Sequence, residues 1–167
     1  MLDATRLVTC HTLHGASKQI PAERLTQRAS VYGLIVHQGA LLLARGIHTG
    51  RYVLPGGGIE PGERIEAALK REVREETGLD VRVDQFLGFH EDFFYYDPLD
   101  AAFHGFLFYY RCTPLTFTLA VDGEVDDEDV AQPCWVPLSE LTAESFQTHG
   151  ETTLRLIQDL HVEFSEF

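Results

Sequence analysis

The chain has 167 residues, 44% of them hydrophobic and 11% aromatic, which is typical of one globular domain. Its formal net charge of -13 repels the backbone of long DNA or RNA. Small phosphorylated molecules are not excluded, because a divalent cation can invert the charge of an acidic pocket. No apolar run approaches the ~20 residues that span a bilayer, and the first 13 residues lack the pattern of a secretory signal. We therefore expect a cytoplasmic protein with no membrane partner.

The three cysteines, Cys10, Cys112 and Cys134, are far apart and form no C-x-x-C pair. An odd number of cysteines without that spacing indicates neither a disulfide framework nor a zinc knuckle. We expect all three to be reduced.

The first 28 residues show no clear hydrophobic period, so we predict an N-terminal extension that contains one strand over residues 6–13. Residues 29–167 are predicted to form a single domain. Apolar and β-branched runs predict its strands, which are residues 31–37, 40–45, 52–54, 81–89, 103–112 and 134–136. Helical spacing predicts helices over residues 64–77 and 151–161. Loops are predicted at residues 55–58, where three glycines follow a proline, at residues 91–102, and in the acidic stretch 122–129.

The first predicted helix carries three carboxylates on its buried side. At about 100° per residue, Glu72, Glu75 and Glu76 lie within or beside the apolar face of this helix. Partial burial of unpaired charges is costly, and a divalent cation would compensate for it. Carboxylate ligands suit Mg²⁺ or Mn²⁺ better than zinc. On the helix alone, a solvated acidic face paired with neighbouring basic residues is an equally good interpretation.

The spacing around these glutamates resembles the Nudix box, G-x5-E-x7-R-E-U-x-E-E-x-G-U, where U is aliphatic. Gly57, Glu63 and residues 71–79 match this pattern at every specified position. The box covers 23 residues, and a looser resemblance extends from about residue 29 to residue 141. The resemblance implies an α/β fold, namely a Nudix-type α/β/α sandwich with a mixed β-sheet. It also implies a magnesium-dependent enzyme that cleaves the pyrophosphate bond of a nucleoside diphosphate-linked substrate.

The resemblance assigns metal binding to Glu72, Glu75 and Glu76, with a backbone carbonyl from Gly56. It implies that one of the box glutamates also takes the proton from the attacking water. Which glutamate acts as this base varies between members of the family. The ion is expected to be Mg²⁺ or Mn²⁺.

Other residues of the box are expected to support this group. The resemblance implies that Arg71 pairs with Glu63 and orients the carboxylates. The glycine-rich segment with Gly57 and Gly58 is expected to grip the diphosphate of the substrate, because glycine lets the backbone approach a ligand closely.

A further metal ligand is expected from a loop after the box. Glu128 is the best candidate, because related chains often place a glutamate in that loop ahead of a tryptophan or other aromatic. Asp92, Glu91 and Glu124 compete with it. A solvated acidic loop is an equally good interpretation for Glu128 itself.

Residues outside the box are expected to choose the substrate. Tyr95 and Tyr96 are similar in position to a tyrosine of dinucleoside polyphosphate hydrolases, although their side chains could equally form a small satellite core. Arg45 and Arg51 are the nearest cations that could contact substrate phosphates, although each alone is more often a surface residue. Arg45, at the end of the strand before the glycines, is the better candidate. These features favour dinucleoside polyphosphates or nucleoside triphosphates over ADP-ribose.

Two alternatives remain open from the sequence. One is an ADP-ribose or nucleotide-sugar pyrophosphatase, and the other is a catalytically silent nucleotide-binding regulator on the same fold. A homodimer is compatible with the sequence, which leaves the oligomeric state open.

Overall fold

The computed structural model describes residues 6–121 and 123–164. Residues 1–5 of the predicted N-terminal extension and Asp122 of the acidic stretch lie outside the described residues. The elements in chain order are β1 (Leu7–Thr12), β2 (Ser17–Pro21), η1 (Ala22–Arg24), β3 (Leu25–His37), β4 (Ala40–Gly46), β5 (Tyr52–Val53), β6 (Gly56–Gly58), α1 (Ile65–Thr77), β7 (Val81–Tyr96), η2 (Asp97–Leu99), β8 (Ala101–Pro114), β9 (Val130–Pro137), η3 (Leu138–Glu140), η4 (Ala143–Ser145) and α2 (Gly150–Phe164).

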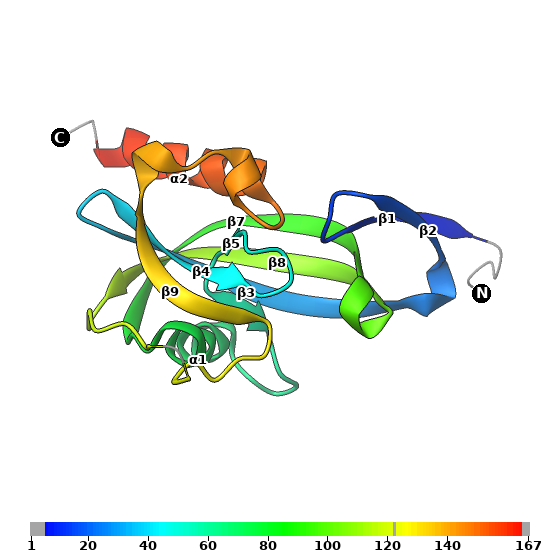
Figure 1. Ribbon diagram of the computed structural model, residues 1–167, viewed down its shortest axis with the longest axis horizontal. Coiled ribbons are helices and arrows are strands. Elements are labelled where there is room, and N and C mark those ends of the chain that lie inside the picture. The colour runs from blue at the N-terminus through cyan, green and yellow to red at the C-terminus, as the bar shows by residue number, and fades with distance from the viewer. Residues whose placement is uncertain (1–5, 122, 165–167) are drawn as a thin grey trace.

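The strands form a mixed sheet in the order β2-β1-β7-β8-β3-β4-β5, with β6 paired to β3 and β9 paired to β4. Strands β3 and β8 are parallel, and so are β1 and β7, whereas the other pairs are antiparallel. Helix α1 covers one face of the sheet and α2 covers the other (Figure 1). This arrangement is the α/β/α sandwich that the sequence predicted.

Alternating side chains of β3 supply both cores, because successive residues of a strand point to opposite faces. Val31 and Ile35 pack with Leu69 of α1 on one face, while Leu34 packs with Ile157 of α2 on the other. Burying one such side chain contributes about 1.5–3 kcal/mol. The two helices are therefore held on the sheet by the same strand.

Helix α1 ends where the sequence predicted. Gly78 adopts the left-handed conformation with φ 78°, and its backbone N–H donates to the carbonyl of Arg74. Glycine carries no Cβ penalty in this conformation, so it terminates helices efficiently. The predicted C-terminal helix is also confirmed, as α2.

The loop predicted over residues 91–102 is wrong. Strand β7 continues to Tyr96, a short 3-10 turn follows at Asp97–Leu99, and β8 begins at Ala101. Phe93 and Phe94 pair directly with His104 and Phe103 of β8, and aromatic side chains favour such pairing. The acidic residues of this segment suggested a loop, but they flank four consecutive aromatic residues that lie in the extended hairpin of β7 and β8.

The loop predicted at residues 55–58 also needs correction, because Gly56–Gly58 forms the short strand β6 and pairs antiparallel with Ser30–Tyr32 of β3. The lack of side chains permits this close pairing. A Cβ on Gly56, whose φ is 147°, would collide with the carbonyl oxygen of Val31.

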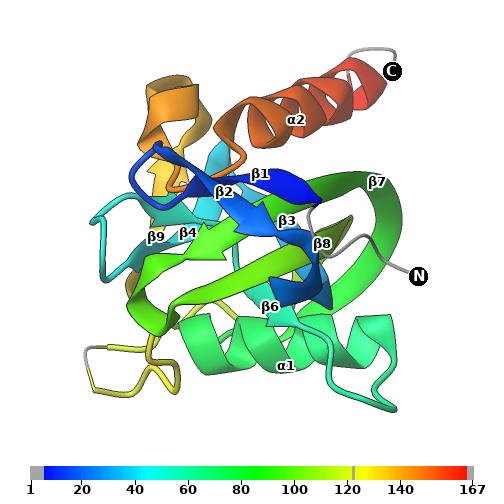
Figure 2. The ribbon, with the colours of Figure 1, turned by 90° about the vertical axis from the view of Figure 1, so that its right-hand side faces the viewer.

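The N-terminal segment forms a hairpin at the edge of the sheet (Figure 2). Its strand β1 confirms the predicted strand, and it pairs in parallel with β7 at His11 and Thr12. Cys10 and Ile20 of this hairpin pack with Tyr95 in a third, small core. Residue 29, where the domain is predicted to begin, lies inside β3.

Two negative expectations can be compared with the structure. All three cysteines are free, as expected. Among the described residues, no helix combines the length and the apolar character that crossing a membrane requires.

Candidate active site

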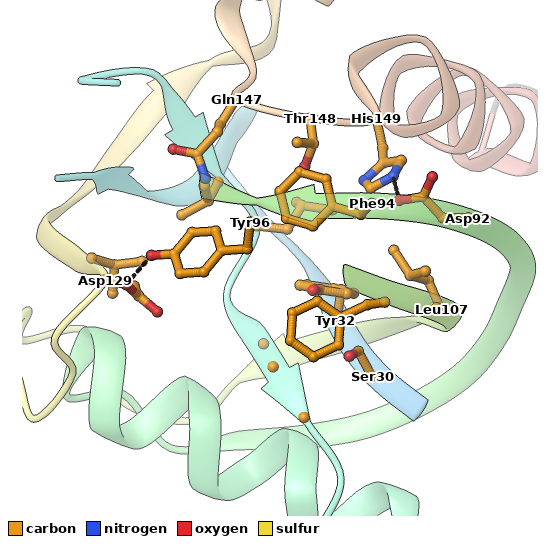
Figure 3. Close-up of a pocket in the computed structure, with 18 of the residues that line it drawn as sticks. Ser30, Tyr32, Asp92, Phe94, Tyr96, Leu107, Asp129, Gln147, Thr148 and His149 are labelled. Carbon is orange, nitrogen blue, oxygen red and sulfur yellow. Dashed lines mark hydrogen bonds and ion pairs between the residues drawn. The ribbon is translucent and has the colours of Figure 1, made fainter. Parts of the chain in front are cut away.

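A cavity of about 310 Å³ lies between the sheet and the segment that leads into α2. Phe94 and Tyr96 of β7 line it from one side, and Tyr32 of β3 lies opposite them (Figure 3). Gln147 and Thr148 close the side next to α2. The glycines of β6 and two glutamates of α1 also line the cavity.

Three carboxylates meet at the box side of this cavity. Glu72, Glu76 and Asp127 each present an oxygen, and these oxygens lie within 4.8 Å of one another. Glu76 is 3% exposed and Glu72 is 8% exposed. Three acidic groups at this separation repel one another, and a cation between them would remove the repulsion.

Burial and mutual repulsion disfavour the charged forms of this group. Desolvation raises the pKa of Glu76 well above its ordinary value, although the Gly56 N–H donates to Glu76 Oε2 at 2.8 Å and opposes the shift. Desolvation also raises the pKa of Glu72, against the nearby guanidinium of Arg71. In the metal-free protein the site is therefore electrostatically unfavourable, as the helix geometry predicted.

Gly57 brings the backbone of β6 against this group. A Cβ on Gly57 would lie 2.8 Å from the carboxylate carbon of Glu72, a distance that real Cβ contacts do not reach. A glycine is required there because the strand and the carboxylate occupy adjacent space. Gly56 and Gly58 also line the cavity, so the glycine segment lies beside the carboxylates.

Arg71 holds the box together from α1. Its Nε and Nη2 donate to the two carboxylate oxygens of Glu63, both at 2.9 Å. Its Nη1 donates to Glu72 at 2.8 Å and to Glu75 at 3.1 Å, and Nη2 also reaches the Gly58 carbonyl at 3.2 Å. The two bonds from Arg71 lower the pKa of Glu63 to about 2. These bonds are the pairing of Arg71 with Glu63 that the resemblance implies.

The structure brings Asp127, and not Glu128, to the carboxylate group. Asp127 is partly buried and lines the cavity, whereas Glu128 is exposed and does not. The loop is fixed to the end of α1 by the Asp126 N–H, which donates to the carbonyl of Glu75 at 3.0 Å. Asp127 Oδ1 then accepts backbone N–H bonds from Asp129 at 2.7 Å and from Val130 at 3.1 Å.

The three other candidates for the additional ligand lie elsewhere. Glu91 is exposed and pairs with His104 at 2.7 Å. Glu124 is exposed and accepts the Val121 N–H at 3.1 Å within a turn. Asp92 lines the cavity but binds two histidines rather than the box glutamates.

The two tyrosines predicted to meet the substrate lie on opposite faces of β7. Tyr96 lines the cavity, and its hydroxyl donates to Asp129. Tyr95 is buried in the third core, and its hydroxyl donates to Asp100. The satellite-core interpretation therefore describes Tyr95, and Phe94 takes its place beside Tyr96 in the cavity.

Arg45 does not line the cavity. Its Nη1 donates to the Gly50 carbonyl at 2.8 Å, and its Nη2 donates to the Tyr52 hydroxyl at 3.0 Å. Arg28 of β3 lines the cavity instead and lies against Gly58. Arg28 falls within the predicted N-terminal extension, where no site residue was expected.

A family model described as the NUDIX domain matches residues 25–157. The chain belongs to the Nudix family. Among curated Nudix relatives, the nucleoside triphosphatase NudI of Escherichia coli O1:K1 / APEC is 52% identical over 59 residues. This match covers 32% of the chain and 42% of that relative, and the NudI of Escherichia coli O9:H4 (strain HS) gives the same figures. The chain thus spans less than half the length of these relatives.

Solved structures show the same Nudix fold. A NUDIX hydrolase from Nitrosomonas europaea has a TM-score of 0.65 at 22% identity, over 83% of this chain and 90% of that one. An ADP-ribose pyrophosphatase from Streptococcus suis 89-1591 has a TM-score of 0.61 at 17% identity, over 81% and 92% of the two chains. These likenesses confirm the predicted Nudix-type fold class.

The Nudix box explains which site residues the sequence revealed. Nudix enzymes generally use a divalent metal, and the box residues that crowd together here are those whose spacing on one helix could be read directly. Asp127 and Arg28 lie outside the box. A signal for Asp127 was its place in the acidic stretch, but nothing in the local sequence distinguishes it from Glu128.

Proposed function

We propose that this Nudix protein is a magnesium-dependent hydrolase that cleaves the pyrophosphate bond of a nucleoside triphosphate or of another nucleoside diphosphate-linked substrate. One observation carries the proposal: Glu72, Glu76 and Asp127 converge beside a glycine-rich strand at the edge of a cavity. This places a carboxylate group next to the backbone that would face a diphosphate. A catalytically silent module has no need to maintain such a repulsive group.

The donor set fits a hard divalent cation. All three groups of the cluster offer oxygen, which Mg²⁺ and Mn²⁺ prefer. Glu72, Glu76 and Asp127 would hold the ion, and the neighbouring Gly56 is proposed to add its carbonyl. The ion would neutralise charge on the phosphoryl oxygens and lower the pKa of the attacking water.

Other side chains have distinct proposed roles around this group. Arg71 keeps Glu72 and Glu75 in place through its shared guanidinium. Glu75 stands outside the three-carboxylate cluster but binds the same guanidinium nitrogen as Glu72, and we propose it as the acceptor of the proton from water. Arg28 would bind a phosphate of the substrate, because it brings a positive charge to the cavity beside Gly58.

The role of Glu75 can be separated from metal binding. Glu75→Gln should lower kcat by about 100-fold or more, as expected for loss of a general base, while the Mg²⁺ concentration for half-maximal rate stays near that of the parent. A large rise in that Mg²⁺ concentration would instead show that Glu75 is a metal ligand.

The cavity supports a nucleoside as the recognised part of the substrate. The aromatic rings of Phe94 and Tyr96 face a space that also contains the amide of Gln147 (Figure 3). Flat rings can stack on a base, and an amide can bond to its edge. The partial match to a nucleoside triphosphatase favours triphosphates as the first substrates to test.

A substrate panel tests the proposal directly. The full chain is incubated with Mg²⁺ and, separately, with nucleoside triphosphates, dinucleoside polyphosphates, ADP-ribose and nucleotide sugars, and the products are resolved by chromatography. We expect nucleoside monophosphate with pyrophosphate, or the two halves of a cleaved diphosphate, and no product with EDTA. If no compound with a pyrophosphate bond is cleaved in Mg²⁺ or Mn²⁺, the proposed function is wrong.

A further inference from the structure

A second cluster of metal-ligating side chains lies away from the box. His11 of β1, Asp92 of β7 and His149, which immediately precedes α2, each offer one ligand atom, and these atoms lie within 4.8 Å of one another. The cluster shares no residue with the carboxylate group of Glu72, Glu76 and Asp127. It is also different in chemistry, since two of its three donors are imidazole nitrogens.

We propose that His11, Asp92 and His149 form a second metal site, which takes Zn²⁺ or a similar transition-metal ion and not the Mg²⁺ of the catalytic group. This inference goes beyond the proposed hydrolase function and does not depend on it.

The distances suit a small tetrahedral ion. His11 Nδ1 lies 3.1 Å from Asp92 Oδ1, and His149 Nε2 lies 2.8 Å from Asp92 Oδ2. Ligand atoms about 2.0 Å from a tetrahedral Zn²⁺ stand roughly 3.3 Å apart. The two histidines contact different oxygens of the Asp92 carboxylate, so an ion held by all three residues would require these side chains to rearrange about that carboxylate. The rings of His11 and His149 meet edge to face with centroids 5.6 Å apart.

The types of ligand atom determine which ion the site prefers. Imidazole nitrogen suits zinc, copper, nickel and iron, whereas magnesium is held by oxygen ligands and keeps several waters. Two imidazoles and one carboxylate leave further coordination positions open, as in zinc sites that retain water. A third imidazole stands beside the cluster, because the His90 and His149 ring centroids are 5.1 Å apart.

The surroundings restrict the movement of these side chains. The side chain of Asp92 is 9% exposed and that of His149 is 16% exposed, while that of His11 is 37% exposed. An ion could therefore enter past His11. Asp92 and His149 also line the cavity (Figure 3), so an ion there would stand beside the bound substrate.

The bound ion would fasten three separate segments. These are the N-terminal hairpin, the long strand β7 and the segment that leads into α2, which together close one side of the cavity. Ligands that bind only the folded state stabilise it in proportion to the logarithm of their concentration. We expect Zn²⁺ at this site to stabilise the folded protein.

The test is isothermal titration of Zn²⁺ into the full chain in the presence of excess Mg²⁺, which competes for any metal site made of carboxylates. We expect one Zn²⁺ per chain. His11→Ala and His149→Asn should each weaken binding by about 10-fold or more, the scale on which even groups that merely orient metal ligands act. Asn is chosen at position 149 because His149 has a φ of 55°, a conformation that asparagine tolerates.

His104→Ala is the matched control. His104 Nε2 lies 2.7 Å from Glu91 Oε1, so this substitution removes an equally close imidazole–carboxylate pair that does not belong to the cluster. Its Zn²⁺ binding should equal that of the parent. Thermal unfolding is the second readout: Zn²⁺ should raise the Tm of the parent and of His104→Ala, and should raise the Tm of the His11→Ala, His149→Asn double variant by much less.

Three results would overturn the proposal. One is the absence of saturable Zn²⁺ binding when Mg²⁺ is present. Another is Zn²⁺ binding that survives unchanged in both His11→Ala and His149→Asn. The third is equal loss of binding in His104→Ala, which would place the ion elsewhere.

Discussion

Glu76 combines a buried position with an acidic side chain. It lies at 3% exposure, receives the Gly56 N–H, and stands within the same group as Glu72 and Asp127. Burial disfavours the charged form of a lone carboxylate in such a place, which raises its pKa. Its presence is explained if a cation normally shares the site.

The metal-free protein should be stabilised by Glu76→Gln at neutral and alkaline pH. Burial raises the pKa of Glu76 in the folded state above the value of about 4.3 in an unfolded chain. The folded state thus binds the proton on Glu76 more tightly than the unfolded state does. The stabilisation of the folded state by this proton is complete below the unfolded pKa and is lost as the pH rises through the folded pKa. Glu76→Gln retains an acceptor for Gly56 and removes the charge.

Urea unfolding in EDTA measures this difference. The variant should be more stable than the parent at about pH 8 and equal to it below about pH 4, where the carboxyl is protonated in both states. A parent that is the more stable protein at pH 8 without metal would contradict the assignment of Glu76 as a buried, repelled carboxylate.

Substitutions of two neighbouring acidic residues in one loop should differ sharply in their effect on the Mg²⁺ requirement. Asp127 lies in the carboxylate group, whereas Glu128 is exposed. Asp127→Asn should therefore raise the Mg²⁺ concentration for half-maximal rate by about 10-fold or more, and Glu128→Gln should leave it unchanged. Titration of activity with Mg²⁺ compares the two variants. A larger rise in the Mg²⁺ requirement for Glu128→Gln than for Asp127→Asn would show that Glu128 is the ligand.

At the scale of elements, the alternation of side chains along β7 determines which of its residues face the cavity. Asp92, Phe94 and Tyr96 line the cavity, while Phe93 and Tyr95 pack in the third core on the opposite face. In a loop the two tyrosines could both meet a ligand. In a strand only one of them can, because successive side chains point in opposite directions.

Tyr96→Ala should raise the KM for nucleotides. Loss of a stacked ring costs ~1–3 kcal/mol, which corresponds to a change of roughly 5- to 150-fold. Tyr96→Phe keeps the ring and removes only the hydroxyl that binds Asp129, so it should stay close to the parent. Steady-state kinetics on a panel of nucleotides makes the comparison. Equal KM values for the parent and Tyr96→Ala on every nucleotide would exclude stacking on this ring.

The sequence predicted elements and residues whose evidence is local. The box could be recognised because its specified positions lie at fixed spacings within 23 residues, and helix geometry places Glu72 and Glu76 side by side. Asp127 could not be chosen over Glu128, because its position depends on a backbone bond from Asp126 to the distant Glu75. Nothing in the residue types of the loop encodes that bond.

The errors in the predicted secondary structure have a similar physical origin. A loop was predicted within the hairpin of β7 and β8 because acidic residues lower the apolar character of residues 91–102. In the structure those acids have partners in other segments, such as the two histidines of Asp92. Strand β3 begins at Leu25 and carries Arg28 into the cavity, although its first residues are too polar to predict a strand.

At the scale of the whole molecule, the sheet carries α1 on one face and α2 on the other (Figure 1). The cavity forms where the sheet, the box and the start of α2 meet. The proposed metal ligands come from α1 and the loop before β9, while the aromatic rings proposed to bind the base come from β7. Chemistry and recognition are therefore supplied by different segments, and substitutions in one can change turnover without changing nucleotide affinity.

The central claim is that the inward carboxylates of α1 perform pyrophosphate cleavage with a divalent ion. It is tested most directly by measuring kcat for Glu76→Gln and for Glu66→Gln on the best substrate of the panel at saturating Mg²⁺. Glu66 lies on the exposed side of the same helix, so the second substitution is a matched control. We predict that Glu76→Gln lowers kcat by about 100-fold or more, the scale of losing one preorganised electrostatic contact, and that Glu66→Gln equals the parent. Near-parental turnover in a folded Glu76→Gln variant would contradict the account.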